Sequence, residues 1–501
     1  MTHDRSQHRH RSASNSQSPD DVTDVCSAMA DDVAELVRDA GAEGNVVVTR
    51  THHGLTRFAN SSIHQHVGDD STTITLSIAV AGRSATASTT TSDLSSVGDL
   101  VTRTITAARQ QPVDNRWPGP TPQTTNQLAV DDAFDAGTAD ASPAARADAV
   151  RAFVGASGTS TEGQAGIAPF LPSAGQTDRL GARYRVTQAT STTAAGYLDT
   201  EATWTSFAST TGHRVASKAT RATIDGIHRT VDTSGAAHHT SWQFADLDPA
   251  TAGIAAATSA TWGQRPIDIE PGDWPVVLGP EAVASVIAFL GAYGFNAKAH
   301  LDGASFVNLG EACFDPAISL WEDPFDPRAV GLRYDAQGVA RQRYPLIDQG
   351  VTVNLAHDRR TALRAGVECS TGNALLGAES WGAIPMNPVL RNGTSSLADL
   401  VAGVERGLYI ARFHYCRVLD PKTQVVTGLT RNGTFLIERG TITTPVTDLR
   451  FTQSFVDALA PGRVIGVAND NRYADSEFGP GMVIAPSVSL ARWSFTGGAS
   501  G

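Results

Sequence analysis

A hydrophobic stretch from Pro275 to Leu290 constrains the fold more than any other part of the sequence. An apolar run typical of a strand reaches Gly279 and Pro280, and apolar residues at helical spacing follow. Proline suits the first position of a helix because its missing N–H would have no partner there. Glu281 then lies in the first turn, where a carboxylate faces the positive end of the helix dipole. The stretch predicts a strand that leads directly into a helix, and such junctions often carry catalytic groups.

Length and composition limit the classes of protein to which the chain can belong. A chain of 501 residues is too long for one ordinary core, so we expect two or three domains. A formal net charge of -12 argues against nucleic-acid binding, which usually needs a basic face. We find no apolar run of membrane-spanning length and no signal-peptide core, and we therefore expect no membrane contact and a cytoplasmic location. Isolated cysteines without a C-x-x-C pair indicate buried thiols in a reducing compartment, namely Cys26, Cys313, Cys369 and Cys416.

The order of apolar patterns predicts an α+β protein. Residues 1–20 are polar and aromatic-free, which predicts a disordered tail. Residues 21–125 predict an N-terminal α/β-type domain with a helix-flanked sheet. Residues 126–265 predict a central region with antiparallel strands. Residues 266–501 predict a mostly antiparallel β domain that is sandwich-like or barrel-like.

Several local patterns give more specific expectations. Residues 44–50 and 55–58 predict two separate strands, and residues 299–306 predict another. Residues 451–460 predict a helix. Asp248 precedes a proline at the start of an Ala-rich segment and is therefore a good helix N-cap.

Histidine pairs are the only readable candidates for a metal site formed without cysteine. His64 and His66 would share one face of a strand, as metal ligands sometimes do, but no third ligand stands at a readable spacing. A polar surface strand is the favoured interpretation. The other pairs offer no stronger pattern: His8 with His10 in the tail, His52 with His53, and His238 with His239.

Two His–Cys pairs raise the alternative of a cysteine nucleophile. His414 and Cys416 are two residues apart and would share a face of a strand, and His357 and Cys369 are close enough in sequence to meet. A cysteine nucleophile needs a positioned base and an electropositive setting. Neither pair carries a recognisable nucleophile signature, so structural thiols are the favoured interpretation.

The sequence resembles the TldD/PmbA family, also called the TldD/TldE or modulator-of-DNA-gyrase family, over nearly the whole chain beyond the tail. No single motif is decisive, but the shared order of the motifs is hard to obtain by chance. The matching segments are residues 55–65 (Leu-Thr-Arg-Phe-Ala-Asn-Ser-Ser-Ile-His-Gln), 272–283, 322–324, 335–339, 346–351, 370–374 and 435–446.

The resemblance implies what the junction would carry in a catalytic member: an H-E-x-x-x-H motif whose histidines bind zinc and whose glutamate acts as general base. A cysteine near the C-terminus completes that ligand set. Here Pro280 and Ser285 stand at the two histidine positions, and only Glu281 remains as a remnant of the motif. Residues 473–482, where the cysteine belongs, contain none. We therefore expect no catalytic residue and no metal in this chain, and the chain looks like the non-catalytic PmbA/TldE-type branch.

The leading hypothesis is a non-catalytic subunit of a TldD/TldE-type zinc metallopeptidase complex in the cytosol. The subunit would pair with a catalytic TldD-type partner, as a heterodimer or larger hetero-oligomer, and help to bind unfolded or small peptides. Zinc is expected only in that partner. One alternative is a stand-alone metallopeptidase with atypical ligands such as His64, His66 or His300. Another is a regulatory protein-binding factor that acts on a toxin–antitoxin or topoisomerase system.

Overall fold

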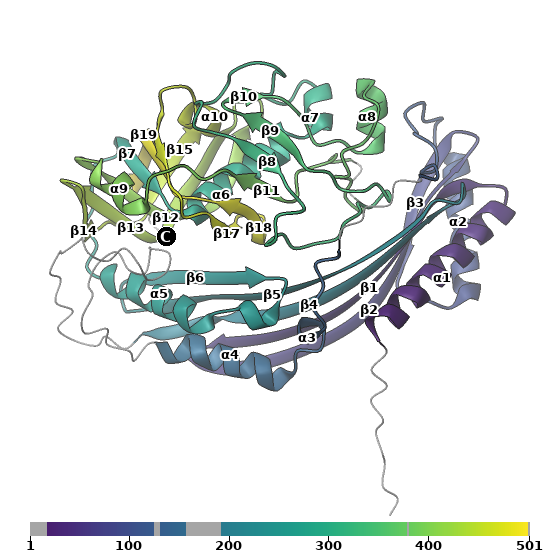
Figure 1. The fold of residues 1–501 in the computed structure, drawn as a ribbon, viewed down its shortest axis with the longest axis horizontal. Coiled ribbons are helices and arrows are strands. Elements are labelled where there is room, and N and C mark those ends of the chain that lie inside the picture. Colours follow the sequence, from purple (N-terminus) through teal and green to yellow (C-terminus); the bar gives the residue numbers. More distant parts are fainter. Residues whose placement is uncertain (1–17, 125–130, 157–191, 378–379, 499–501) are drawn as a thin grey trace, which may run out of the picture.

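The computed structural model describes residues 18–124, 131–156, 192–377 and 380–498 (Figure 1). Most of the expected tail, including His8 and His10, lies outside these residues, and the part of it after Ser18 begins the first helix. The first half of the described chain forms one curved antiparallel sheet with the strand order β3-β2-β1-β4-β5-β6. Its strands are β1 (Glu43–Ala59), β2 (Ser62–Val80), β3 (Arg83–Thr89), β4 (Thr193–Ser209), β5 (Arg214–Arg229) and β6 (Ser234–Ser241).

One face of this sheet is covered by helices, as Figure 1 shows. Alternate residues of a strand point to opposite faces, and Leu198 of β4 and Ile224 of β5 pack against Phe153 on the helical side. On the other half of the same face, Val33 packs in a cluster with Ile74. The helices are α1 (Pro19–Asp39), α2 (Leu94–Gln110), α3 (Ala136–Ala139), α4 (Pro143–Gly155), α5 (Pro249–Trp262) and the one-turn η2 (Phe244–Asp246).

The sheet runs across the boundary that the sequence suggested at residue 125. Strand β1 pairs with β2 on one side and with β4 on the other, so the ranges 21–125 and 126–265 contribute strands to the same layer. The two strands expected at 44–50 and 55–58 are parts of the single strand β1. Partners along both edges of β1 hold Gly54 in the ladder, although the local pattern His52-His53-Gly54 indicates a break.

The second half of the described chain contains a barrel-like sheet and a smaller mixed sheet. In the barrel, strands β12-β7-β19-β15-β13 lie side by side and β13 pairs back with β12, which closes the ring. This confirms the expected mostly antiparallel, barrel-like architecture. The barrel and its neighbours comprise β7 (Gly272–Leu278), β12 (Arg406–Asp420), β13 (Val425–Glu438), β14 (Thr441–Pro445), β15 (Leu449–Ser454), β16 (Val464–Val467) and β19 (Val488–Gly498).

The smaller sheet has the order β10-β9-β8-β11-β18-β17. Its strands are β8 (Leu320–Glu322), β9 (Tyr344–Asp348), β10 (Val351–Thr352), β11 (Pro388–Leu390), β17 (Arg472–Ser476) and β18 (Gly479–Ala485). The helices of this half are α6 (Pro280–Phe289), the π-helical turn η3 (Leu290–Gly294), α7 (Ala297–Leu301), α8 (Arg359–Ala365), α9 (Leu397–Ala402) and α10 (Phe455–Ala458).

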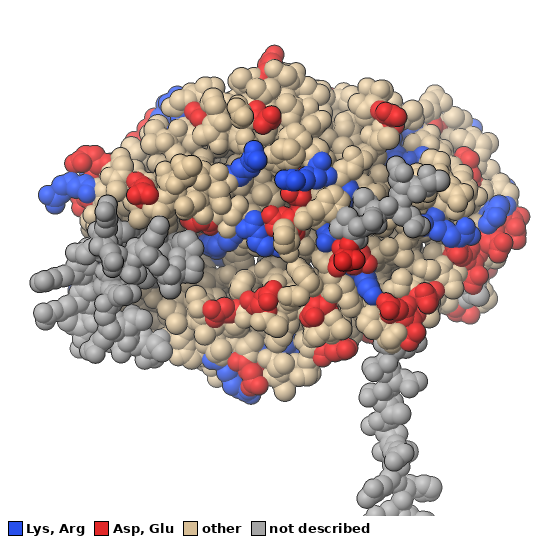
Figure 2. Space-filling model, in the orientation of Figure 1, with Lys and Arg blue, Asp and Glu red and all other residues tan. Residues whose placement is uncertain are grey.

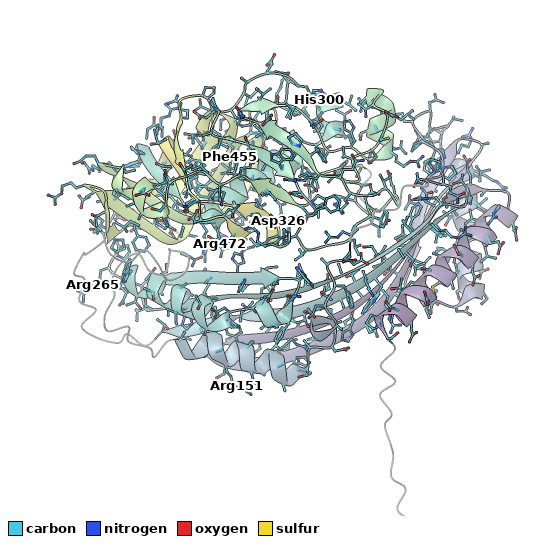
Figure 3. The ribbon with its side chains drawn as sticks, in the orientation of Figure 1. Arg151, Arg265, His300, Asp326, Phe455 and Arg472 are labelled. Atoms are coloured by element: carbon cyan, nitrogen blue, oxygen red, sulfur yellow. The ribbon has the colours of Figure 1, made fainter. Side chains whose placement is uncertain are left out.

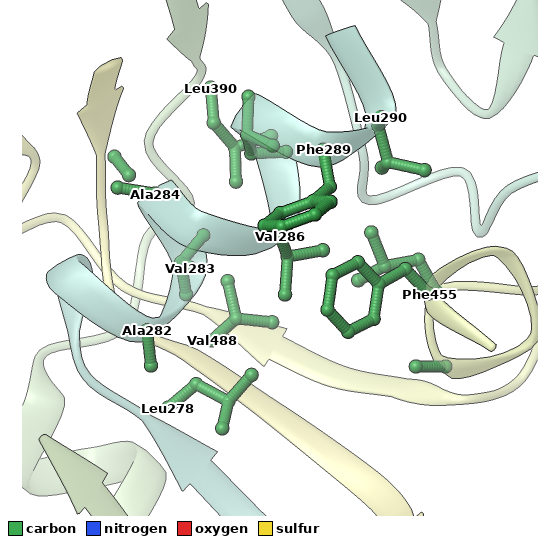
Figure 4. Close-up of a cluster of buried hydrophobic side chains, with 14 of the residues drawn as sticks. Leu278, Ala282, Val283, Ala284, Val286, Phe289, Leu290, Leu390, Phe455 and Val488 are labelled. Carbon is green, nitrogen blue, oxygen red and sulfur yellow. The ribbon is translucent and has the colours of Figure 1, made fainter. Parts of the chain in front are cut away.

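The core of the second half forms around α6 and the barrel strands. Val283, Val286 and Phe289 of α6 lie against Val488 and Phe455 (Figure 4). Because almost every residue of α6 is buried, the helix passes between the barrel and the smaller sheet with no polar face toward water. This packing fixes the position of the β7–α6 junction.

Two local expectations were wrong. The segment 299–306 is not a strand, because residues up to Leu301 complete helix α7, which Asn296 caps. Most of the helix expected at 451–460 is strand β15, which pairs with β13 and β19 and completes the barrel. Only Phe455–Ala458 remain helical. Long-range strand pairing outweighed the local pattern in the second segment, whereas the first segment follows its local cap.

Candidate functional site

The β7–α6 junction lies where the second half of the chain faces the uncovered side of the long sheet. Strand β7 ends at Leu278 between β12 and β19, Gly279 caps the helix, and Pro280 occupies its first turn as expected. A Cβ atom at Gly279 would lie 2.8 Å from the Tyr409 hydroxyl, so a larger residue would displace this tyrosine. The expected strand-to-helix geometry is therefore present and tightly packed.

Glu281 forms a two-pronged ion pair with Arg472 of β17. The Arg472 Nη1 and Nη2 atoms donate to Glu281 Oε1 and Oε2 at 2.5 Å and 2.8 Å. The Glu281 side chain is 16% exposed, and that of Arg472 is 48% exposed. Burial alone would raise the pKa of Glu281, but Arg472, His238 and the hydrogen bonds together hold this pKa below its ordinary value.

A histidine of the long sheet also approaches this pair. His238 of β6 places its Nδ1 atom 3.7 Å from Glu281 Oε1, and its side chain is 1% exposed. Glu281 thus links the helix of the second half to an edge strand of the first. Figure 3 shows Arg472 at the side of the second half that faces the sheet.

The residues at the two histidine positions of the motif do not fit a metal. Pro280 has no donor atom in its side chain, and the Ser285 hydroxyl donates to the main-chain oxygen of Glu281 at 3.1 Å. Both carboxylate oxygens of Glu281 already accept hydrogen bonds from Arg472. Within the described ranges, no group of three or more His, Cys, Asp or Glu side chains is arranged to hold a metal ion.

The last cysteine lies in the barrel wall rather than at the junction. Cys416 of β12 is 1% exposed and belongs to the barrel core, and burial raises the pKa of its thiol far above the ordinary value. Its backbone N–H donates to Glu477 Oε2 at 3.2 Å. His414 is 42% exposed and lies 3.8 Å from Glu477 Oε1. A β-bulge between His414 and Arg417 breaks the regular alternation on which the expected His–Cys contact depended.

The second His–Cys pair is also unsuited to nucleophilic catalysis. His357 is buried and burial lowers its pKa, whereas Cys369 is exposed. Among the described residues, no hydrogen bond joins the two side chains.

The remaining histidine candidates are separated and engaged elsewhere. His64 is the extra residue of a bulge in β2, so it does not keep the alternation that would align it with His66. His66 contacts Thr56 and the guanidinium of Arg146, a cation that disfavours a metal ion at the same nitrogen. The Nδ1 atom of His300 is bonded to a main-chain oxygen at 3.0 Å.

The histidines of the long sheet have different neighbours. His53 lies 3.6 Å from Asp199, and the hydrogen bond to this carboxylate raises the pKa of His53. His239 accepts a hydrogen bond from the backbone N–H of Asp248, and burial lowers its pKa. Asp248 itself caps α5 as the sequence predicted, with its side chain accepting from the Thr251 N–H.

A crevice lies between the second half of the chain and part of the uncovered face of the sheet, and contacts such as the hydrogen bond from the Arg333 N–H to Ser217 Oγ bridge the two elsewhere. Figure 2 shows this hollow across the middle of the molecule, with basic and acidic side chains gathered along it. At the β3 end, a pocket of about 60 Å³ lies between strands β1–β3, the start of helix α8 at Arg359, and the loops that carry Gln337 and Leu376. The junction, the pocket and the crevice together form the candidate site.

Comparisons with known proteins agree with this architecture. Residues 271–497 match the model of the PmbA/TldA metallopeptidase C-terminal domain. A curated metalloprotease of Methanothermobacter thermautotrophicus is 27% identical over 204 residues, which cover 40% of this chain and 44% of the relative. An uncharacterized protein of Methanocaldococcus jannaschii is 29% identical over 128 residues, which cover 25% of this chain and 30% of that protein. The matches thus span less than half the length of these curated relatives.

Two solved structures share the fold over almost their whole length. TldE from Thermococcus kodakarensis superposes with a TM-score of 0.78 at 16% identity, covering 94% of this chain and 100% of that one. A proposed modulator of DNA gyrase from Thermotoga maritima gives a TM-score of 0.76 at 18% identity, covering 94% and 99%.

The barrel, the β7–α6 junction and the domain match define a metallopeptidase-related protein. Residues 271–497 thus carry the C-terminal domain of the PmbA/TldA family, and the chain shares its fold with the two solved structures over 94% of its length. Within the part of the chain that the structure describes, none of the helices has the length and apolar character needed to cross a membrane.

Sequence reasoning found Glu281 and missed both of its partners. Arg472 is 191 residues away along the chain, and no spacing rule links the two positions. The signal that could have found Arg472 is its position directly before the segment 473–482, where the resemblance puts the zinc-binding cysteine of catalytic members. His238 was considered only as half of a His–His pair.

Proposed function

We propose that this chain is the non-catalytic subunit of a TldD/TldE-type peptidase complex in the cytosol. The observation that carries the proposal is the Glu281–Arg472 ion pair at the place where the family resemblance puts a metal-binding motif. A catalytic zinc needs three protein ligands and one open position. The junction instead offers a proline, a serine bonded to its own helix and a glutamate already neutralised by an arginine.

The electrostatics of the pair also argue against a catalytic role for Glu281. A general base must be within reach of a proton on substrate or water, and it works best with a pKa near the working pH. The pKa of Glu281 is lowered, and both carboxylate oxygens are occupied. The pair therefore supports a structural role, in which α6 and β17 are held against β6. Zinc and the cleavage chemistry would belong to the partner subunit.

Binding of an extended peptide suits the remaining surface. Strand β3 is an edge of the long sheet, and an edge strand can pair with a peptide through main-chain hydrogen bonds without strict sequence demands. The pocket beside β3 is lined by small side chains of the sheet, by Arg359 and Arg360, and by the apolar side chains of Trp117, Leu375 and Leu376. A peptide added to β3 would run along this pocket toward the crevice. The subunit would thus help to hold unfolded or small peptides for the catalytic partner.

Co-expression tests the proposal. This chain with an affinity tag is expressed together with an untagged catalytic homologue that carries H-E-x-x-x-H, and the purified material is analysed for both chains, for zinc and for peptide cleavage. We expect the two chains to purify together, with zinc in proportion to the homologue only. As a matched control, a homologue whose motif glutamate is changed to glutamine should still assemble but cleave nothing. If no complex forms and the homologue alone is fully active, the proposal fails.

A further inference from the structure

A row of polar residues crosses the uncovered face of the long sheet directly below the junction. Tyr197 of β4 is opposite Asp225 of β5, and Asp225 is opposite His238 of β6. Residues paired in this way point to the same face of a sheet. Because His238 approaches Glu281 of α6, the row faces the second half of the chain across the crevice.

Asp225 is a carboxylate that makes no direct ion pair, although the charges of His238 and Arg412 act against the rise of its pKa. Among the described residues, Asp225 makes no ion pair within 4 Å and no side-chain hydrogen bond, although it is only partly exposed. Burial, reinforced by the charge of Asp475, raises the pKa of Asp225. An ionised carboxylate in such a place is unfavourable for the folded state unless something compensates for it.

The neighbouring positive charges of His238 and Arg412 compensate only in part, because the nearby arginines are paired with other carboxylates. Asp475 pairs with Arg412 at 3.0 Å. Asp199 pairs with Arg221 at 3.3 Å, and the same arginine lies 3.5 Å from Glu201. The carboxylates of this region therefore outnumber its arginines.

Two buried polar atoms beside Asp225 also have no hydrogen-bond partner among the described residues. One is Oδ1 of Asp199, whose side chain is 10% exposed, and the other is Nε2 of His238, whose side chain is 1% exposed. Buried polar groups are almost always satisfied in folded proteins. His238 is opposite Asp225 in the β5–β6 ladder, and Asp199 lies two residues from Tyr197, which is opposite Asp225 in the β4–β5 ladder. Unsatisfied atoms on two sides of an unpaired carboxylate are what a bound polar ligand would complete.

We infer that Asp225, with Asp199 and Tyr197 beside it, binds the ammonium group of a peptide in the crevice. An ammonium has three N–H donors and no acceptor, which matches a site of carboxylate oxygens and a hydroxyl. A metal ion is disfavoured, because no group of three ligating side chains converges among the described residues. A guanidinium is less suited, because its planar fork prefers two coplanar acceptors.

The ammonium can come from the N-terminus of a peptide or from a lysine side chain. An N-terminal ammonium bound at Asp225 would fix one end of the chain, and hence the direction in which a peptide runs along the sheet. A lysine would instead select for sequence. This inference rests on the proposed peptide-binding function and names the chemical group by which the site would recognise its ligand.

Peptide binding by the full-length chain tests the inference. The probes are three alanine–threonine peptides labelled with a dye at the C-terminus: one with a free N-terminus, one N-acetylated, and one N-acetylated with a single lysine. Binding is measured by fluorescence anisotropy for the wild-type chain, for Asp225→Asn and for Asp70→Asn. Asp70→Asn is the control. It removes a carboxylate of β2 that is 49% exposed and pairs with Arg50 of β1 at 3.0 Å.

We expect the free-amine peptide to bind the wild-type chain about tenfold or more tightly than the acetylated peptide, the range of a charge-assisted hydrogen bond. Asp225→Asn should abolish this difference, and Asp70→Asn should preserve it. If the acetylated lysine peptide binds as tightly as the free-amine peptide, the site accepts any ammonium group. If it binds as weakly as the acetylated peptide without lysine, the site is specific for the N-terminal ammonium.

The failures of the two proposals can be told apart. If the wild-type chain binds the free-amine and the acetylated peptides with equal affinity, the ammonium site is refuted and the proposed peptide binding is not. No binding of any peptide would overturn both proposals. Acetylation is tested on the wild-type chain, so this part of the result does not depend on how the variants fold. Asp225→Asn should melt no lower than the wild type, because it removes an unpaired carboxylate from a buried site.

Discussion

Removing Arg472 should destabilise the protein more than removing Glu281, although the two residues form one ion pair. The Glu281 side chain is only 16% exposed, and Arg472→Gln leaves its carboxylate without the cation that pairs with it. Breaking a fully buried pair in this way costs about 3–5 kcal/mol. Because Arg472 is 48% exposed, water screens the pair, and we expect about 2–3 kcal/mol.

Glu281→Gln should cost only about 1 kcal/mol, since the half-exposed guanidinium that remains can be solvated and the amide still accepts a hydrogen bond. Part of this cost is the lost carboxylate in the first helical turn, which contributes about 0.3–1 kcal/mol. The double variant should be more stable than Arg472→Gln alone, because no unpaired charge is left buried.

Urea-induced unfolding of the four proteins, followed by circular dichroism at neutral pH, measures these differences as a double-mutant cycle. The pH dependence gives a second test. Because the folded-state pKa of Glu281 is lowered from its ordinary value of 4.5, its stabilising contribution is complete above that pH and is lost as the pH falls through the folded-state pKa. The gap between wild type and Glu281→Gln should therefore close in acid. Equal costs for the two single variants, or a double variant no more stable than Arg472→Gln, would refute the reasoning.

Three further predictions follow from burial and packing. In the native protein, iodoacetamide should modify exposed Cys369 and leave Cys416 unmodified, as mass spectrometry of tryptic peptides would reveal, because Cys416 is 1% exposed and burial raises its thiol pKa. Trp493→Ala should lower the free energy of unfolding by about 3–5 kcal/mol, because this fully buried ring stacks on Phe413 at 4.9 Å in the barrel core, and an unchanged urea midpoint would contradict that packing. Gly196→Ala should cost about 2 kcal/mol or more in the same measurement, because its Cβ would lie 2.3 Å from a main-chain oxygen of β5.

Local chemistry made parts of the fold predictable from the sequence. Asp248 caps α5, and Pro280 begins α6, because each effect depends only on residues within one helical turn. The alternating segments likewise predicted antiparallel strands. The barrel closure between β12 and β13 supports the expected barrel-like architecture of the second half.

Two of the errors have a common physical cause, which is long-range strand pairing. Residues 451–454 are extended because β13 and β19 flank them, and neither partner is adjacent in sequence. The same applies to β1, where pairing on both edges carries the strand through Gly54. Contacts of this kind outweigh intrinsic preferences that are worth a few tenths of a kcal/mol per residue.

The candidate site was predictable only at one residue. Glu281 could be located because the strand–helix pattern and the family resemblance both point to it. The interactions that give Glu281 its role come from Arg472 and His238, which reach it only after β17 and β6 are brought together by the fold. Asp225 had no signal in the sequence at all, because its environment is created by the facing half of the chain.

The rate of peptide cleavage by a catalytic TldD-type homologue, measured with and without this chain in the presence of zinc, tests the central claim most directly. The account predicts that this chain alone cleaves no peptide and that adding it to the homologue increases the rate until the two chains are equimolar. Chelator-sensitive cleavage by this chain alone, or a homologue whose rate this chain does not change at any ratio, would contradict the assignment of a non-catalytic subunit.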